Sequence, residues 1–126
     1  MNKCLLLLTL LMAQLTPLSA SAEEEEEFLT AGELLTGCEE GSSPGAPNQY
    51  CMQYLFGFVQ TVLSLQSADP SQPQLFCIDP QRIGLPEVTD TMTAYLRSQQ
   101  GRMDQEAYKL VGEALAKNYP CDSKPF

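Results

Sequence analysis

Residues 48–65, NQYCMQYLFGFVQTVLSL, carry the pattern that decides the fold of this chain. Their apolar side chains recur every three or four positions, at Cys51, Leu55, Phe58, Val62 and Leu65. This spacing predicts a helix with one apolar face. Tyr54 and Val59 widen that face, so we expect this helix to be the most buried one in the chain. Asn48 can accept a hydrogen bond from an N–H of the first turn, which predicts that it is the N-cap.

A second stripe of the same helix consists of small residues: Gly57, Thr61 and Ser64. Small side chains allow another helix to come close. The stripe is compatible with ordinary core packing, which we favour, or with the docking of a second subunit.

The first 22 residues are typical of a secretory signal peptide. Lys3 supplies the positive charge, residues 5–12 form an apolar run, and Ala20-Ser21-Ala22 provides the small side chains that signal peptidase requires. We expect cleavage before Glu23 and export of the remaining chain. The apolar run is too short to cross a bilayer, and no later stretch is long enough, so we expect no membrane insertion after cleavage.

The rest of the chain is strongly acidic and long enough for one domain. The whole sequence of 126 residues holds 16 acidic and 7 basic residues, with a formal net charge of −9. Such a surface lacks the basic footprint that nucleic acids require, and it attracts cationic proteins. Residues 23–27 are five consecutive glutamates, which we expect to form a flexible acidic tail ahead of a single domain, residues 28–126.

Four cysteines remain after the signal peptide and Cys4 are removed: Cys38, Cys51, Cys77 and Cys121. An even number of cysteines in a small exported chain indicates two disulfides. A zinc site is the rival interpretation, but the sequence has no CxxC pair and no histidine. We therefore expect structural disulfides and no metal.

Three further helices are predicted around the central one. Thr30 and Glu33 have the spacing of a capping box, which predicts a helix over residues 31–39 with Leu34, Leu35 and Cys38 facing inward. A helix beginning near Pro86 should bury Leu85, Val88, Met92, Tyr95 and Leu96 and end at a left-handed Gly101. A last helix, capped by Asp104 and reaching Tyr119, should bury Ala107, Leu110, Val111, Ala114 and Leu115. The sequence therefore predicts an all-α fold, a small disulfide-stapled bundle of about four helices.

Two connections between these helices lack a helical pattern. Residues 40–47, EGSSPGAP, are either a connector, which composition favours, or an exposed binding loop. Residues 66–84 hold three prolines, and within them we expect residues 75–78, LFCI, to close one end of the core.

The cysteines allow three pairings, among which sequence alone does not choose. Antiparallel packing of neighbouring helices ranks them, because it places the end of one helix beside the start of the next. Cys38–Cys51 would join the first helix to the second, and Cys77–Cys121 would join the start of the third to the end of the fourth. We favour this pairing.

Catalytic chemistry finds little support in the sequence. The chain has no histidine, the commonest general base, and no glycine-rich phosphate loop. Most carboxylates fall on predicted solvent faces, so a carboxylate-based hydrolase lacks a pair of inward acids. We expect no catalytic residues, no cofactor and no enzyme.

Several short motifs in order resemble one known family. They are Phe28-x-Thr30, Leu34-Leu35-x-x-Cys38, Cys51-x-x-Tyr54-Leu55-x-Gly57, Phe76-Cys77-Ile78, Tyr95-Leu96, and Glu113-Ala114-Leu115 followed by Tyr119-Pro120-Cys121. Together they resemble the Rap-type immunity proteins, small helical periplasmic proteins of Gram-negative bacteria. The chain differs from many relatives at Gln60, in its glutamate run and in its 40–47 loop.

The resemblance implies an exported, disulfide-bonded helical protein that is often a homodimer. It also implies a partner, a cell-wall amidase effector delivered by type VI secretion, which the immunity protein binds and blocks. Residues 40–47 and 66–75 are the candidate edges for insertion into the substrate groove of such an enzyme. The alternative is a periplasmic stress chaperone or envelope-interaction domain with no toxin partner.

Overall fold

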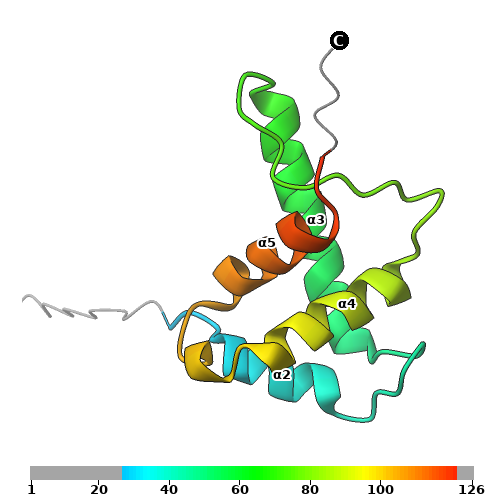
Figure 1. The fold of residues 1–126 in the computed structure, drawn as a ribbon, viewed down its shortest axis with the longest axis vertical. Helices are drawn as coiled ribbons and strands as arrows, with labels where there is room; N and C mark the ends of the chain where they lie inside the picture. The colour runs from blue at the N-terminus through cyan, green and yellow to red at the C-terminus, as the bar shows by residue number, and fades with distance from the viewer. Residues whose placement is uncertain (1–26, 122–126) are drawn as a thin grey trace, which may run out of the picture.

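The computed structural model describes residues 27–121, and within them the chain is all-helical (Figure 1). The elements are α2 (Ala31–Glu39), α3 (Gln49–Ala68), α4 (Leu85–Ser98), the 3-10 turn η1 (Gln100–Arg102) and α5 (Ala107–Asn118). The predicted all-α fold is confirmed. The signal peptide over residues 1–22 and all of the acidic tail except Glu27 lie outside the described residues. No helix in the described part is long and apolar enough to span a membrane.

The core lies where α2, α4 and α5 meet the first half of α3. Helix α4 contacts the three other α-helices and occupies the middle of the molecule. It buries Val88, Met92 and Leu96 as predicted, and Thr89 as well, whereas Leu85 is 37% exposed. All five residues predicted for the inner face of α5 are buried, namely Ala107, Leu110, Val111, Ala114 and Leu115.

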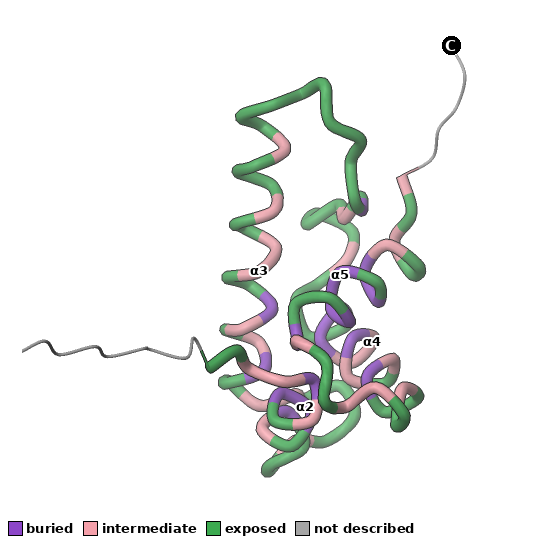
Figure 2. Tube along the Cα trace, turned by 90° about the vertical axis from the view of Figure 1, so that its left-hand side faces the viewer, coloured by how far each residue is buried: buried purple, intermediate pink, exposed green. Residues whose placement is uncertain are grey.

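The central helix is less buried than its apolar pattern predicts. Only Cys51 and Leu55 are buried in α3, and Leu65 is 66% exposed. The second half of α3 extends beyond the other helices, as the exposed and intermediate residues along its outer turns show (Figure 2). The prediction that this helix is the most buried one is therefore wrong, since α5 buries six of its twelve residues.

The start of α5 is set by the start of α2. The backbone N–H groups of Ala31 and Gly32 donate to the carbonyls of Gln105 and Met103, at 2.8 and 2.9 Å. These bonds satisfy N–H groups that the first turn of a helix leaves without a partner. They also hold residues 103–106 outside a helix, so α5 begins at Ala107 and not after an Asp104 cap. The Asp104 prediction is wrong, whereas the Thr30 and Glu33 capping box is confirmed.

Helix α4 ends without the predicted left-handed glycine. The N–H of Gln99 donates to the carbonyl of Leu96, and the N–H of Arg102 donates to Gln99. These bonds span three residues and continue a right-handed turn of the 3-10 type. Gly101 lies inside that turn, and the positive-φ glycines of the described chain are Gly41 and Gly45. The prediction of a left-handed cap at Gly101 is therefore wrong.

The connection predicted over residues 66–84 begins at Asp69, because α3 continues to Ala68, and one of its residues is fully buried in the core. Phe76 is 1% exposed and stacks on Phe58, with ring centroids 6.5 Å apart. Leu75 next to it is 49% exposed. The Cys77–Cys121 disulfide and the hydrogen bond from the Cys77 N–H to the Tyr119 carbonyl join this connection to the end of α5. The segment closes the core as predicted, but through Phe76 and the half-buried Ile78 rather than through all of its apolar side chains.

Candidate interaction surface

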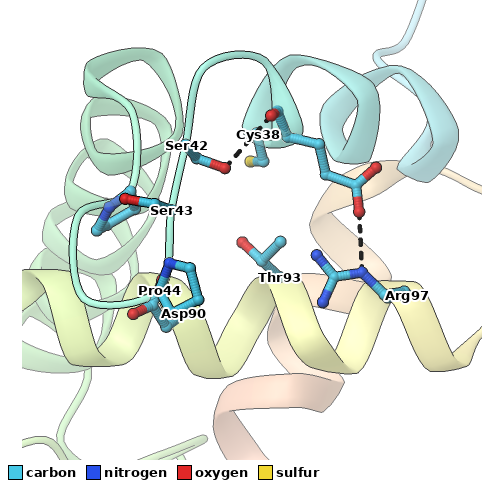
Figure 3. A pocket seen from close by; sticks show the side chains of 9 residues that line it. Cys38, Ser42, Ser43, Pro44, Asp90, Thr93 and Arg97 are labelled. Atoms are coloured by element: carbon cyan, nitrogen blue, oxygen red, sulfur yellow. Dashed lines mark hydrogen bonds and ion pairs between the residues drawn. The ribbon is translucent and has the colours of Figure 1, made fainter.

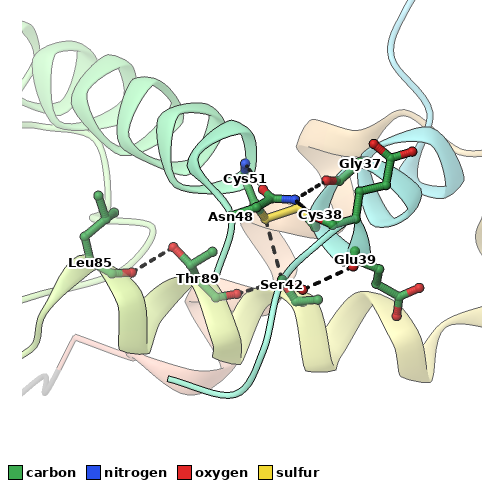
Figure 4. Close-up of a disulfide and its surroundings, with 10 residues drawn as sticks. Gly37, Cys38, Glu39, Ser42, Asn48, Cys51, Leu85 and Thr89 are labelled. Carbon is green, nitrogen blue, oxygen red and sulfur yellow. Dashed lines mark hydrogen bonds between the residues drawn. A yellow bond between two sulfur atoms is a disulfide. The ribbon is translucent and has the colours of Figure 1, made fainter. Parts of the chain in front are cut away.

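The loop of residues 40–47 is fixed at its base by a disulfide and an asparagine (Figure 4). Cys38 near the end of α2 is bonded to Cys51 in the first turn of α3, with Cα atoms 4.8 Å apart. The Asn48 side chain accepts from the Cys51 N–H at 2.8 Å, as an N-cap does. Its amide nitrogen also donates to the carbonyls of Gly37 and Glu40. One side chain therefore begins α3 and ties it to the end of α2.

The tip of this loop is fixed as well. Ser43 and Ala46 exchange two backbone hydrogen bonds, of 3.2 and 2.9 Å, and so form a tight turn. Gly45 takes the positive φ of 79° that this turn requires, a conformation that glycine adopts without strain. The Gly45 N–H donates to Oδ2 of Asp90 on α4 at 2.9 Å. The loop is thus held to α4 at a distance of 45 residues along the chain.

A pocket of about 360 Å³ lies between this loop and α4 (Figure 3). Asp90, Thr93 and Arg97 line its α4 side, and Ser42, Ser43 and Pro44 line its loop side. Arg97 donates through Nε to Oε1 of Glu39 at 2.9 Å, and both side chains are largely exposed. The pocket therefore has both polar and apolar walls, is open to solvent and is bounded by a loop held in place at its base and tip.

Two further hollows flank the outer half of α3, and both are apolar. One, of about 340 Å³, lies against the 78–88 segment and includes Phe56, Leu63 and Leu85. The other, of about 490 Å³, lies against α5 and includes Leu75 and Tyr108. The small residues Gly57, Thr61 and Ser64 line neither hollow and are exposed, and a Cβ added to Gly57 meets no atom within 4 Å. Core packing, the favoured interpretation of that stripe, is therefore not what the structure shows.

The two loops predicted as candidate edges do not share a face. Residues 40–47 precede α3 and residues 69–75 follow it, so they lie at opposite ends of that helix (Figure 1). A helix of this length spans about 30 Å. The 69–75 turn is organised around Asp69, whose carboxylate accepts from the N–H and hydroxyl of Ser71. A single groove of a partner therefore takes one loop or the other.

Several carboxyl groups of the surface are held in the charged form by local hydrogen bonds. The backbone N–H and hydroxyl of Thr30 lower the pKa of Glu33, and the Ser71 side chain lowers the pKa of Asp69. Lys109 lowers the pKa of Glu106, and Arg102 lowers the pKa of Glu113. The acidic character inferred from composition therefore persists at neutral pH. In the described chain no three side chains of the metal-binding types converge on one point.

The sequence pattern found the loop and missed the α4 residues opposite it. Asp90, Thr93 and Arg97 are spaced three and four apart, which places them on one polar stripe of α4. The stripe can be recognised in the sequence. Its contact with the loop cannot, because it joins residues far apart along the chain. The predicted disulfide partners are joined as the hairpin argument favours, Cys38 to Cys51 and Cys77 to Cys121.

Comparison with known proteins gives one match. The family model described as Rap1a immunity proteins matches residues 30–121, which include the four α-helices of the described part of the chain and both of its disulfides. No curated protein and no solved structure matches the chain significantly.

Proposed function

Because this chain belongs to the Rap1a immunity protein family, whose members are non-catalytic and protect against type VI secretion effectors, we propose that it binds and occludes a peptidoglycan amidase effector in the periplasm. The family is periplasmic, and two disulfides suit an oxidising compartment. Export by the signal peptide of residues 1–22 belongs to the same proposal.

The braced 40–47 loop is the observation that supports occlusion most directly. A disulfide, the Asn48 side chain and Asp90 hold it at its base and tip. A loop ordered before binding loses little conformational entropy when a partner engages it. Rigid loops of this kind enter the grooves of hydrolases without large rearrangement. The 69–75 turn lies at the far end of α3 and is the weaker candidate edge.

An inhibition assay with two matched variants tests this proposal. The oxidised protein, residues 23–126, is used to isolate its effector from the native strain, and peptidoglycan hydrolysis by that effector is then measured with and without it. We expect stoichiometric inhibition. Ser43→Trp, which places a bulky ring on the exposed loop, should abolish inhibition, whereas Ser71→Trp on the other exposed loop should leave it unchanged.

Two results would count against the proposal. An effector that still hydrolyses peptidoglycan in the presence of excess protein contradicts occlusion. Hydrolysis of peptidoglycan by the purified protein itself contradicts a non-catalytic role. If Ser71→Trp abolished inhibition and Ser43→Trp did not, the effector would contact the 69–75 loop instead of the 40–47 loop.

The exposed apolar residues of α3 favour one alternative, a stress chaperone or envelope-interaction domain. Phe56, Leu63 and Leu65 are 55%, 40% and 66% exposed. Phe56 and Leu63 line the same apolar hollow, and exposed apolar patches of this kind are typical of surfaces that bind other proteins. This alternative predicts suppression of the aggregation of unrelated proteins at acid pH, where the carboxyls are protonated. An oligomeric state and apolar dye binding that stay constant from neutral to acid pH would exclude it.

A further inference from the structure

The pocket beside the 40–47 loop has one negative charge that no described residue compensates. Its charged members are Glu39, Asp90 and Arg97. Glu39 and Arg97 form an ion pair of 2.9 Å, so their charges cancel. Asp90 accepts a hydrogen bond from the Gly45 N–H, which is neutral and occupies only Oδ2. The second oxygen of Asp90 remains available to a partner.

Three hydroxyl groups line the same pocket as this carboxylate. Ser42 and Ser43 line the loop side of the pocket, and Thr93 lies one turn along α4 from Asp90 (Figure 3). Thr93 already donates to the carbonyl of Thr89 at 2.9 Å, so its oxygen is left to accept. A carboxylate with neighbouring hydroxyl acceptors suits an ammonium or guanidinium group, which only donates hydrogen bonds. At about 360 Å³ the pocket is at the small end of the range of ligand sites, which suits one side chain.

On the basis of the proposed function, we infer that this pocket receives a lysine or arginine side chain of the effector, with the cationic group on Asp90. The net charge of the chain favours the approach of such a partner. The terminal nitrogens of Arg97 point toward Thr93, so an anionic side chain is the competing occupant (Figure 3). It would face both Glu39 and Asp90, and the pocket's net charge opposes it.

The test is an NMR titration of the oxidised protein that needs no effector. The probes are three blocked tripeptides, Ala-Arg-Ala, Ala-Gln-Ala and Ala-Glu-Ala, which differ in the charge of the central side chain. We expect the arginine peptide to shift the amide signals of Gly45, Asp90 and Thr93, and the other two peptides to leave them unchanged. Charge-assisted hydrogen bonds make Asp90→Asn bind the arginine peptide about tenfold more weakly or worse.

Two variants separate a pocket from a general charge effect. Asp90→Asn keeps an oxygen for the Gly45 N–H, so the loop stays in place while the charge is lost. Glu87→Gln removes the same charge from an exposed position of α4 outside the pocket. We expect Glu87→Gln to change the affinity less than about twofold, because exposed charges at this range are screened by salt.

Arg97→Gln tests the competing occupant. It removes the positive charge beside the pocket, so affinity for the arginine peptide should rise. Three results would overturn the inference. The first is a set of shifts caused by the glutamate peptide that disappears in Arg97→Gln. The second is an equal loss of affinity for the arginine peptide in Asp90→Asn and Glu87→Gln, and the third is the absence of any shift with the arginine peptide. Inhibition of the effector without arginine binding would leave the proposed function standing and reject this inference alone. Binding of the arginine peptide without inhibition of the effector would support a cation site in this pocket and reject the proposed function.

Discussion

Asn48 has two structural roles, of which a local sequence pattern predicts only one. Its position before an apolar helical run predicts the cap on α3, and the structure confirms it. Its amide nitrogen also bonds the carbonyls of Gly37 and Glu40 across the loop. That second role depends on where α2 ends in space, which no local pattern encodes. The residue that looks like an ordinary N-cap is thus also the brace of the candidate binding loop.

Substitutions of Asn48 separate the two roles. Asn48→Ala removes the cap and both donated hydrogen bonds, and we expect a loss of about 2–3 kcal/mol in the free energy of unfolding. Asn48→Asp keeps the capping oxygen but places a carboxylate near two carbonyls, so it should destabilise by about 1–3 kcal/mol. Urea unfolding of the oxidised protein measures both. Wild-type stability of Asn48→Asp would show that the cap alone matters.

The Arg102 and Glu113 pair predicts how stability responds to acid. Arg102 donates two hydrogen bonds to the Glu113 carboxylate, at 2.6 and 2.7 Å, and chiefly for this reason the pKa of Glu113 lies below its ordinary value of 4.5. The unfolded chain therefore takes up this proton first as the pH falls. The contribution of the pair is complete above pH 4.5 and is lost as the pH falls through that value toward the lower folded-state pKa.

Glu113→Gln should accordingly reduce stability at pH 7 and flatten the loss of stability below pH 4.5. Urea unfolding at a series of pH values from 7 to 3 gives both quantities. Adding Arg102→Gln should change the pH dependence little further, because the two residues share the ion pair, and it should lower stability only through its other hydrogen bonds, to Gln99 and Gln105. Parallel pH curves for Glu113→Gln and the wild type would show that the pair does not couple folding to protons.

At the scale of elements, the connection between α3 and α4, residues 69–84, contributes one fully buried side chain to the core. Phe76→Ala removes a fully buried ring and should lower the free energy of unfolding by about 3–5 kcal/mol. Leu75→Ala, one position away, removes a side chain that is 49% exposed and should cost less than about 1 kcal/mol. Thermal and urea unfolding compare the two variants. Equal effects would mean that the connection is held by its disulfide and not by Phe76.

The positions of the helices could be predicted from the sequence, whereas their exact ends and the extent of their burial could not. Apolar periodicity located α2, α4 and α5 because each has one inner face. It placed the start of α5 two residues early, because the backbone bonds from α2 to residues 103–105 are non-local. It overestimated the burial of α3, because a periodic face shows which side chains can be covered and not how many neighbours reach them. Tertiary contacts decided each of these points.

At the scale of the whole molecule, the acidic net charge and the two disulfides could be predicted from the sequence, but the candidate interaction surfaces could not. The candidate pocket unites a loop at residues 42–44 with α4 residues about 50 positions later, so it exists only in the folded chain. The two candidate loops looked equivalent in composition, and the structure separates them to opposite ends of α3. It also shows which apolar side chains are left outside the core.

The outer half of α3 is the surface on which we place the predicted homodimer. Leu65 is 66% exposed, and the small residues Thr61 and Ser64 beside it are exposed too, so a second helix can approach this face closely. Association would bury apolar area that a single chain leaves in water, which is the main driving force for dimers of this kind.

We therefore expect the oxidised protein, residues 23–126, to sediment as a dimer in analytical ultracentrifugation. Leu65→Glu should convert it to a monomer with unchanged unfolding, because this side chain contributes little to the core. Gln53→Glu, an equal charge change at an exposed position in the first half of α3, should leave the dimer intact. A wild-type protein that sediments as a monomer at high concentration would contradict the dimer.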